Sequence, residues 1–160
     1  MSNSQWYRVY KLRFNLAMQD PDMPIPRFHT QIFIETNAEG PGTGTKHHVI
    51  GDIVTGMYYE SKPCHNPDRS ESLYSKELLG YTNASIYPQE FDKILSGIPA
   101  PPRQKAFNAK TMRTEPVKSW EPLTFYEPGE PRQPLVKCTE WTEQQAIPTL
   151  SSKGLIVQRR

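Results

Sequence analysis

Residues 28–36 read Phe28-His29-Thr30-Gln31-Ile32-Phe33-Ile34-Glu35-Thr36. β-Branched and aromatic side chains dominate this stretch, and its alternate positions form two faces that both carry apolar residues. Such a pattern predicts a β-strand with a histidine next to its first residue. Three prolines between residues 21 and 26 separate it from residues 6–16, where apolar and polar side chains alternate and predict a half-buried strand.

Further strands are expected after this one, because turn-forming residues divide the next part of the chain into short stretches. A glycine-rich turn at residues 40–44 precedes residues 47–50, and Gly51-Asp52 precedes residues 57–60. These stretches predict antiparallel strands joined by tight turns.

Helix signals appear in the middle of the chain. Asp68 and Glu71 have the spacing of a capping box, which predicts a helix that ends at Gly80. A second short helix is expected from Pro88 to Gly97, with its apolar residues on one stripe. Strands followed by helices predict an α+β fold, in which helices pack on one side of an antiparallel sheet.

The length of 160 residues fits a single domain, residues 1–160. Eight of the 16 prolines lie between residues 99 and 134, where several aromatic residues accompany them. A free linker would not be so aromatic. This segment therefore predicts a long ordered loop wrapped over the core.

Composition argues against several classes of protein. The net charge of +2 is too small to indicate binding to nucleic acid. No apolar run approaches the roughly 20 residues of a membrane span, and the N-terminus lacks the features of a secretory signal. Two cysteines do not make a disulfide scaffold, so we expect a cytoplasmic protein with free thiols and with no cofactor. The sequence leaves the oligomeric state open.

Cys138 is the residue that most directly indicates a chemistry. It begins a stretch up to Ala146 that reads as a short helix, and the first turn of a helix favours a thiolate. Glu140 and Glu143 lie in the same turns and oppose that charge. The best base is His29, which opens a strand and could meet a facing helix in space. The alternative is that Cys138 is a small buried residue and its partner a polar residue at a strand end.

A third catalytic residue is harder to choose. His48 lies on the neighbouring predicted strand and could orient the imidazole of His29, while His47 points to the other face. Asp52 is the second choice, although Gly51-Asp52 is more simply explained as a turn.

Other clusters carry weaker signals. Cys64 and His65 are neighbours in a loop, where adjacent side chains point apart. A zinc site would have to combine them with His47 and His48, without the usual ligand spacing. The glycines of residues 40–44 lack the Lys-Ser/Thr of a phosphate-binding loop. We therefore expect neither a metal nor a phosphate loop.

Taken in chain order, several of these features resemble the circularly permuted papain-fold cysteine peptidases, the PPPDE and NlpC-like superfamily. The features are Phe28-His29-Thr30-Gln31-Ile32-Phe33-Ile34, then Gly51-Asp52, then Gly56-Met57-Tyr58-Tyr59-Glu60, and last the helix that opens at Cys138. In that group a histidine-threonine pair leads an early strand and the cysteine heads a late helix. Members include isopeptidases that remove ubiquitin-like modifiers, and lecithin-retinol acyltransferase-like enzymes share the layout.

The resemblance implies a permuted papain-like fold in which Cys138 is the nucleophile and His29 its base. The expected function is a thiol hydrolase or acyltransferase, which acts on an amide, isopeptide or ester bond of a peptide, protein or acyl substrate. The backbone N–H of the cysteine and a neighbouring donor would hold the oxyanion. The competing hypothesis is a non-catalytic interaction domain that binds a protein through its proline- and aromatic-rich loop.

Overall fold

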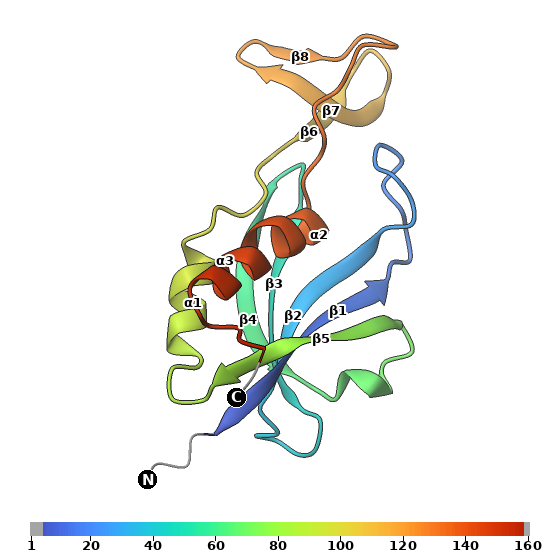
Figure 1. The fold of residues 1–160 in the computed structure, drawn as a ribbon. Coiled ribbons are helices and arrows are strands. Elements are labelled where there is room, and N and C mark those ends of the chain that lie inside the picture. The colour runs from blue at the N-terminus through green and yellow to red at the C-terminus, as the bar shows by residue number, and fades with distance from the viewer. Residues whose placement is uncertain (1–4, 159–160) are drawn as a thin grey trace.

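A five-stranded antiparallel sheet forms the centre of the computed structural model, which describes residues 5–158 (Figure 1). Its strands are β1 (Trp6–Asn15), β2 (Phe28–Glu35), β3 (Gly44–Asp52), β4 (Gly56–Cys64) and β5 (Leu73–Asn83), in the order β4-β3-β2-β1-β5. The α+β class is confirmed, as are the four strands predicted in the first part of the chain. Residues 1–4, most of the N-terminal segment considered for a signal, lie outside the described residues.

β2 is the central strand, and side chains on both of its faces are buried. It pairs with β1, where Arg13 lies opposite Thr30, and with β3, where Ile32 lies opposite His47. Five consecutive residues, 30–34, are buried. This burial explains why the stretch carries apolar residues at both odd and even positions, unlike a strand with one solvent face.

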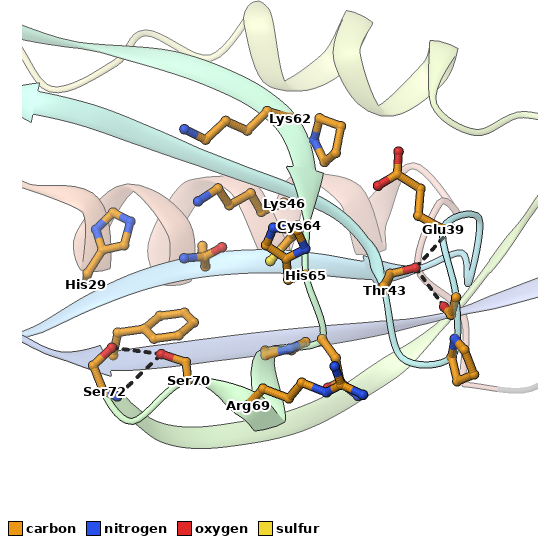
Figure 2. Close-up of a pocket in the computed structure, with 17 residues that line it drawn as sticks. His29, Glu39, Thr43, Lys46, Lys62, Cys64, His65, Arg69, Ser70 and Ser72 are labelled. Carbon is orange, nitrogen blue, oxygen red and sulfur yellow. Dashed lines mark hydrogen bonds between the residues drawn. The ribbon is translucent and has the colours of Figure 1, made fainter.

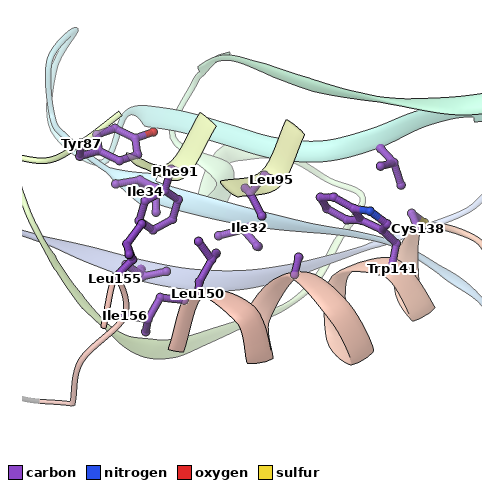
Figure 3. Close-up of a cluster of buried hydrophobic side chains, with 13 residues drawn as sticks. Ile32, Ile34, Tyr87, Phe91, Leu95, Cys138, Trp141, Leu150, Leu155 and Ile156 are labelled. Carbon is purple, nitrogen blue, oxygen red and sulfur yellow. The ribbon is translucent and has the colours of Figure 1, made fainter. Parts of the chain in front are cut away.

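Helices cover one face of the sheet (Figure 1). They are α1 (Gln89–Ser96) and a continuous C-terminal segment that consists of α2 (Cys138–Glu140), η2 (Trp141–Ala146) and α3 (Ile147–Ser152). Two of the three predicted helices, those from Pro88 and from Cys138, are confirmed in place. The main core lies between these helices and the sheet (Figure 3), and its largest fully buried members are Ile32, Ile34, Phe91, Leu95, Trp141 and Leu150.

The middle of the C-terminal helical segment, η2, has π-helical hydrogen bonding. The N–H of Ile147 donates to the carbonyl of Thr142, five residues earlier. The next residue is Pro148, which has no N–H and whose ring crowds the carbonyl four residues before it in an ordinary α-helix. A widened turn just before the proline relieves this conflict, and α3 then begins with the proline in its first turn.

The helix predicted from Asp68 and Glu71 to Gly80 is wrong. Only a short 3-10 turn, η1 (Pro67–Arg69), forms there, and the N–H of Asp68 donates to the side chain of Asn66, which caps the turn. The residues that follow form β5, which pairs with β1 along almost its whole length. A capping-box spacing is a local signal, and the free edge of β1 outweighs it by offering a full ladder of backbone hydrogen bonds.

The proline-rich segment is not the wrapped loop that the sequence suggested. Within residues 99–134 it forms a second sheet from β6 (Lys105–Asn108), β7 (Arg113–Trp120) and β8 (Leu123–Phe125). This sheet, which we call the arm (residues 105–125), projects away from the five-stranded sheet (Figure 1). Pro122 falls in the turn between β7 and β8, whereas Pro116 lies within β7, where it pairs with Lys105 of β6. Four of its large apolar side chains are exposed: Phe107, Met112, Trp120 and Leu123.

The base of the arm is tied to the rest of the domain by charges. Lys105 is buried and its Nζ lies 3.2 Å from Asp20 Oδ1 and 2.7 Å from Asp22 Oδ2. Burial would raise the pKa of Asp20, but hydrogen bonds from Lys137, the Asp22 backbone and Lys105 outweigh it and lower that pKa to about 2. The loop before β2 is thus fixed to the arm and to the start of the Cys138 helix.

Candidate functional site

Cys138 begins α2, as predicted, but it is part of the hydrophobic core. Its side chain is 7% exposed, and its Sγ donates a weak hydrogen bond of 3.7 Å to the backbone carbonyl of Phe28. The hydroxyl of the next residue, Thr139, lies 2.7 Å from that of Thr30 on β2. The helix start therefore packs directly on the face of β2 that carries Thr30.

His29 lies on the opposite face of the sheet. Successive side chains of a strand point to opposite sides, and Thr30 points to the helix. The Nε2 of His29 lies 2.9 Å from the Nδ1 of His48. Among residues 5–158 no hydrogen bond joins the imidazole of His29 to the thiol of Cys138. The thiol instead contacts the backbone carbonyl of Phe28, the residue that precedes His29. The pairing of Cys138 and His29 as a dyad stays a prediction.

The two glutamates near Cys138 do not stand as free charges. Arg27 donates to both oxygens of Glu140, at 2.6 and 2.9 Å, and Glu143 accepts from Lys11 and Arg13 on β1. Burial is the largest single effect and would raise the pKa of Glu140, but the hydrogen bonds from Arg27 and the Lys137 N–H, together with the charge of Arg27, outweigh it and the pKa falls. The sequence placed these carboxylates correctly but did not show the cations that neutralise them.

A hydrogen-bonded chain of three side chains lies on the face of the sheet away from the helices, which we call the open face. The Nε2 of His48 donates to Glu60 Oε2 at 2.9 Å, since a carboxylate only accepts. Burial lowers the pKa values of both imidazoles, that of His29 to about 4, so both are neutral near pH 7. The Nδ1 of His48 must then accept a hydrogen bond from the protonated Nε2 of His29, which leaves the Nδ1 of His29 without a proton.

The expectation that His48 orients His29 therefore agrees with the geometry, whereas Glu60 was missed. Glu60 lies directly opposite His48 in the pairing of β3 with β4. Counting the paired residues of the two strands outward from the turn after Gly51-Asp52 would have placed Glu60 opposite His48. Asp52 itself accepts hydrogen bonds from the N–H groups of Val54 and Thr55, so it shapes the turn.

His47 points to the helix face and is fully buried. Its Nδ1 lies 2.6 Å from the hydroxyl of Tyr59, which donates to Asp92 Oδ1 at 2.9 Å, and its Nε2 lies 2.6 Å from the hydroxyl of Tyr87. Burial lowers its pKa to about 4. Both ring nitrogens are satisfied, which gives His47 a structural role between the sheet and α1.

A hollow of about 960 Å³ lies over one end of the open face (Figure 2), and we call it the open-face pocket. Its floor comes from β2, through His29 and Gln31. Paired strands β3 and β4 supply Lys46, Lys62 and Cys64. Its rim consists of the β2–β3 hairpin and the segment between β4 and β5: Glu39, Gly40, Pro41, Thr43, His65, Asn66, Pro67, Arg69, Ser70 and Ser72.

Two features of this pocket are unusual for a purely structural surface. The side chain of Gln31 is 3% exposed, and its Oε1 has no hydrogen-bond partner, although a buried polar atom is normally paired. Lys46 lies directly opposite Lys62 on the paired strands, and no ion pair of Lys46 is present within residues 5–158. The pocket therefore lies over a buried, unpaired amide oxygen and carries a cation that no ion pair holds in residues 5–158.

The structure also places the other candidate site residues, Cys64 and His65, and the residues of the zinc set. Cys64 and His65 both line the open-face pocket, and burial raises the pKa of the Cys64 thiol, which makes it less reactive. The zinc set is not assembled, because His47 and His48 point to opposite faces. No group of three histidine, cysteine or acidic side chains suited to a metal exists in the described part of the chain.

The fold and the site together define an α+β domain with helices on one face of its sheet and a polar pocket on the other. The chain belongs to the DUF6540 family, a family of unknown function, whose match covers residues 16–157. That range contains both the open-face pocket and Cys138. No curated protein and no solved structure matches the chain. Within residues 5–158 no helix has the length and apolarity that crossing a membrane requires.

Proposed function

We propose that this chain is a binding protein for a small anionic molecule, which the open-face pocket holds. The observation that carries the proposal is the arrangement of Lys46, which faces Lys62 across two paired strands and forms no ion pair in residues 5–158. The nearby acid, Glu60, whose pKa Lys46 helps to lower, is already hydrogen-bonded to His48. Like charges directly opposite each other in a sheet are destabilising, by about 0.2–1 kcal/mol. An anion bound between the two ammonium groups would remove this cost and use both charges.

The size and character of the hollow support a small ligand. A volume of about 960 Å³ is at the upper end of the usual range of small-molecule sites, about 300–1,000 Å³. Arg69 adds a third cation from the rim, and no ion pair of its guanidinium occurs in residues 5–158. The floor is held rigidly, because Glu60 and His48 fix the ring of His29. A pocket with fixed polar groups and unpaired cations is suited to binding an anion.

The thiol hydrolase or acyltransferase of a permuted papain fold is the second candidate. The order of elements supports it, with His29 on an early strand and Cys138 at the start of a late helix that contacts that strand. The mechanism would need His29 to reach the helix face, where Thr30 now contacts Thr139. Because the imidazole is instead bonded to His48 on the open face, the geometry favours binding over catalysis.

Titration calorimetry with inorganic pyrophosphate tests the proposal. The unmodified chain should bind this probe, and Lys46→Gln combined with Lys62→Gln should weaken binding at least tenfold, the equivalent of about 1.4 kcal/mol. Lys153→Gln, which removes an exposed charge at the end of α3, away from the pocket, is the control and should bind normally. Equal binding by the double variant, or no binding by the unmodified chain, would overturn the proposal.

A further inference from the structure

We infer that the open-face pocket takes up a proton together with its anion, and that the hydrogen-bonded pair of His29 and His48 holds this proton. The inference rests on the proposed function and adds the regulation of the same site by pH. Three observations carry it: His29 lines the pocket, His48 is hydrogen-bonded to it, and the carboxylate of Glu60 stands behind His48.

The pair has one ring nitrogen at which a further proton can enter. The Nε2 of His48 lies 2.9 Å from Glu60 Oε2, and its Nδ1 lies 2.9 Å from the Nε2 of His29. Because a carboxylate only accepts, one proton lies on the Nε2 of His48 and one lies between the rings, whichever ring donates it. Only the Nδ1 of His29 is left, and no hydrogen bond engages it in residues 5–158. Since His29 lines the pocket, the added proton enters on the ligand side.

Without a ligand, the surroundings oppose a positive charge on this pair. His48 is 4% exposed, and burial disfavours the charged form of an imidazole. The ammonium groups of Lys46 and Lys62 extend toward the end of the pocket where His29 lies (Figure 2). Burial is the largest cause of the lowered pKa values of both imidazoles, and the charge of Lys46 contributes to each. The pair therefore stays neutral near pH 7 while no anion is bound.

Other ionisable groups around the pair come from each neighbouring element. β1 places the uncharged Phe14 opposite His29. The groups on β3 and β4 and on the pocket rim are Lys46, Tyr58, Glu60, Lys62, Cys64, Glu39, His65 and Arg69. Within the described chain, Glu60 is the one acid that is hydrogen-bonded to the pair. The free pocket thus offers the imidazoles a counter-charge on one side and cations on the other.

A bound anion reverses this balance. It neutralises the ammonium groups and places negative charge beside the Nδ1 of His29. One unit of charge about 5 Å away, at an effective dielectric constant of about 20, raises the proton affinity of an imidazole by roughly a hundredfold. As the shared proton moves between the rings, the positive charge reaches His48, where Glu60 stabilises it. By linkage, the anion must then bind more tightly as the pH falls.

Titration calorimetry with inorganic pyrophosphate, at about pH 5.5 and in two buffers of different ionisation enthalpy, measures the protons that are taken up on binding. The unmodified chain should take up about half a proton or more beyond His29→Gln, and this difference cancels protons exchanged by pyrophosphate itself. Glu60→Gln keeps an acceptor for His48 but removes the counter-charge, so the extra uptake should fall to less than about half.

His65→Gln is the matched control, because His65 lines the same pocket but is exposed and not hydrogen-bonded to the pair. The extra uptake should persist in this variant, whatever its affinity. The imidazole nitrogen shifts of the unmodified chain report the same event without any substitution, which keeps the test decisive if His29→Gln does not fold. At about pH 5.5, the Nδ1 of His29 should be unprotonated in the free chain and protonated after pyrophosphate is added.

Equal uptake by the unmodified chain and His29→Gln, with pyrophosphate still bound, would overturn the proton coupling and leave the proposed function intact. An Nδ1 of His29 with the same protonation state before and after binding would do the same. Loss of the extra uptake in His65→Gln would assign the proton to another residue and contradict the inference, and full uptake in Glu60→Gln would contradict the role of the carboxylate. Failure of pyrophosphate to bind the unmodified chain would overturn both proposals.

Discussion

Lys46 and Lys62 face each other directly across the paired strands β3 and β4, on the face of the sheet that no helix covers. Lys62 has Glu60 3.8 Å away, whereas no ion pair of Lys46 is present in residues 5–158. Lys46 also contributes to the lowered pKa values of His29 and His48, after the larger effect of burial. Its charge therefore influences the whole open-face pocket.

The first prediction concerns the stability cost of this pair. Lys46→Gln should raise the free energy of unfolding by about 0.2–1 kcal/mol in the absence of ligand, because the repulsion across the strands is removed. Urea denaturation at low salt measures the gain, which should shrink at about 1 M salt, where the screening length falls to about 3 Å. Lys153→Gln should show no such gain. A loss of stability in Lys46→Gln at low salt would show that the charge is compensated after all.

The second prediction concerns pH. Burial lowers the pKa of His47 from 6.5 to about 4, so the unfolded chain takes up the proton first as the pH falls. The free energy of unfolding should be highest above pH 6.5 and should fall between about pH 6.5 and 4, with His47 alone responsible for up to about 3 kcal/mol. His29 and His48 act in the same direction.

Urea denaturation at several pH values checks this dependence. His47→Gln cannot be protonated, so its stability should decrease less steeply between pH 6.5 and 4 than that of the unmodified chain, even if it is less stable at pH 7.5. An identical slope in the two proteins would contradict the assignment of His47 as a buried neutral imidazole.

The third prediction separates the binding proposal from the thiol hydrolase. Cys138 is buried in the core and Cys64 is half-buried, so a small alkylating reagent should label Cys64 faster than Cys138 at neutral pH. Single-cysteine variants, Cys64→Ser and Cys138→Ser, allow each rate to be measured by mass spectrometry. His29→Ala should leave the rate of Cys138 unchanged, since its ring is bonded to His48 on the other face. Fast labelling of Cys138 that His29→Ala abolishes would instead support the Cys-His dyad.

The fourth prediction concerns the anchor of the Cys138 helix. Arg27 and Glu140 form a two-point ion pair of which both members are largely buried. Glu140→Gln should lower the free energy of unfolding by about 2 kcal/mol, because a charge-assisted pair is broken and Arg27 loses its counter-charge. Thermal or urea denaturation measures the loss. The exposed pair of Lys118 and Glu130 provides the control, and Lys118→Gln should leave the midpoint unchanged. Equal midpoints for both variants would contradict this role of Glu140.

The sequence predicted those parts of the fold that depend on local pattern. Residues 28–34 could be recognised as a strand because their composition has no helical alternative, and the start of the last helix followed from the change at Cys138. β5 was missed because its sequence fits a helix start and a strand about equally, and the free edge of β1 decides between them. The arm was missed because its short strands are stabilised mainly by each other.

Local sequence pattern also predicted part of the candidate site. Strand alternation places His29 and Thr30 on opposite faces, but only the tertiary contact of Thr30 with Thr139 shows which face the helix covers. The pairing of His29 with His48 could be expected from neighbouring strands. The charges of the open-face pocket could not be predicted from the sequence, because Lys46, Lys62 and Arg69 come from three separate segments. The pairing of β3 with β4 and the loop after β4 bring these segments to one pocket.

The most direct test of the central claim is a map of where an anion binds, obtained from backbone amide chemical shifts during a titration with inorganic pyrophosphate. Saturable shifts should concentrate at residues 29–31, 46, 62 and 64–72, and residues 138–152 on the helix face should stay unchanged. The imidazole nitrogens of His29 should shift in the same titration. Saturable shifts confined to the helix face around Cys138, or none anywhere, would contradict the assignment of the open-face pocket as the functional site.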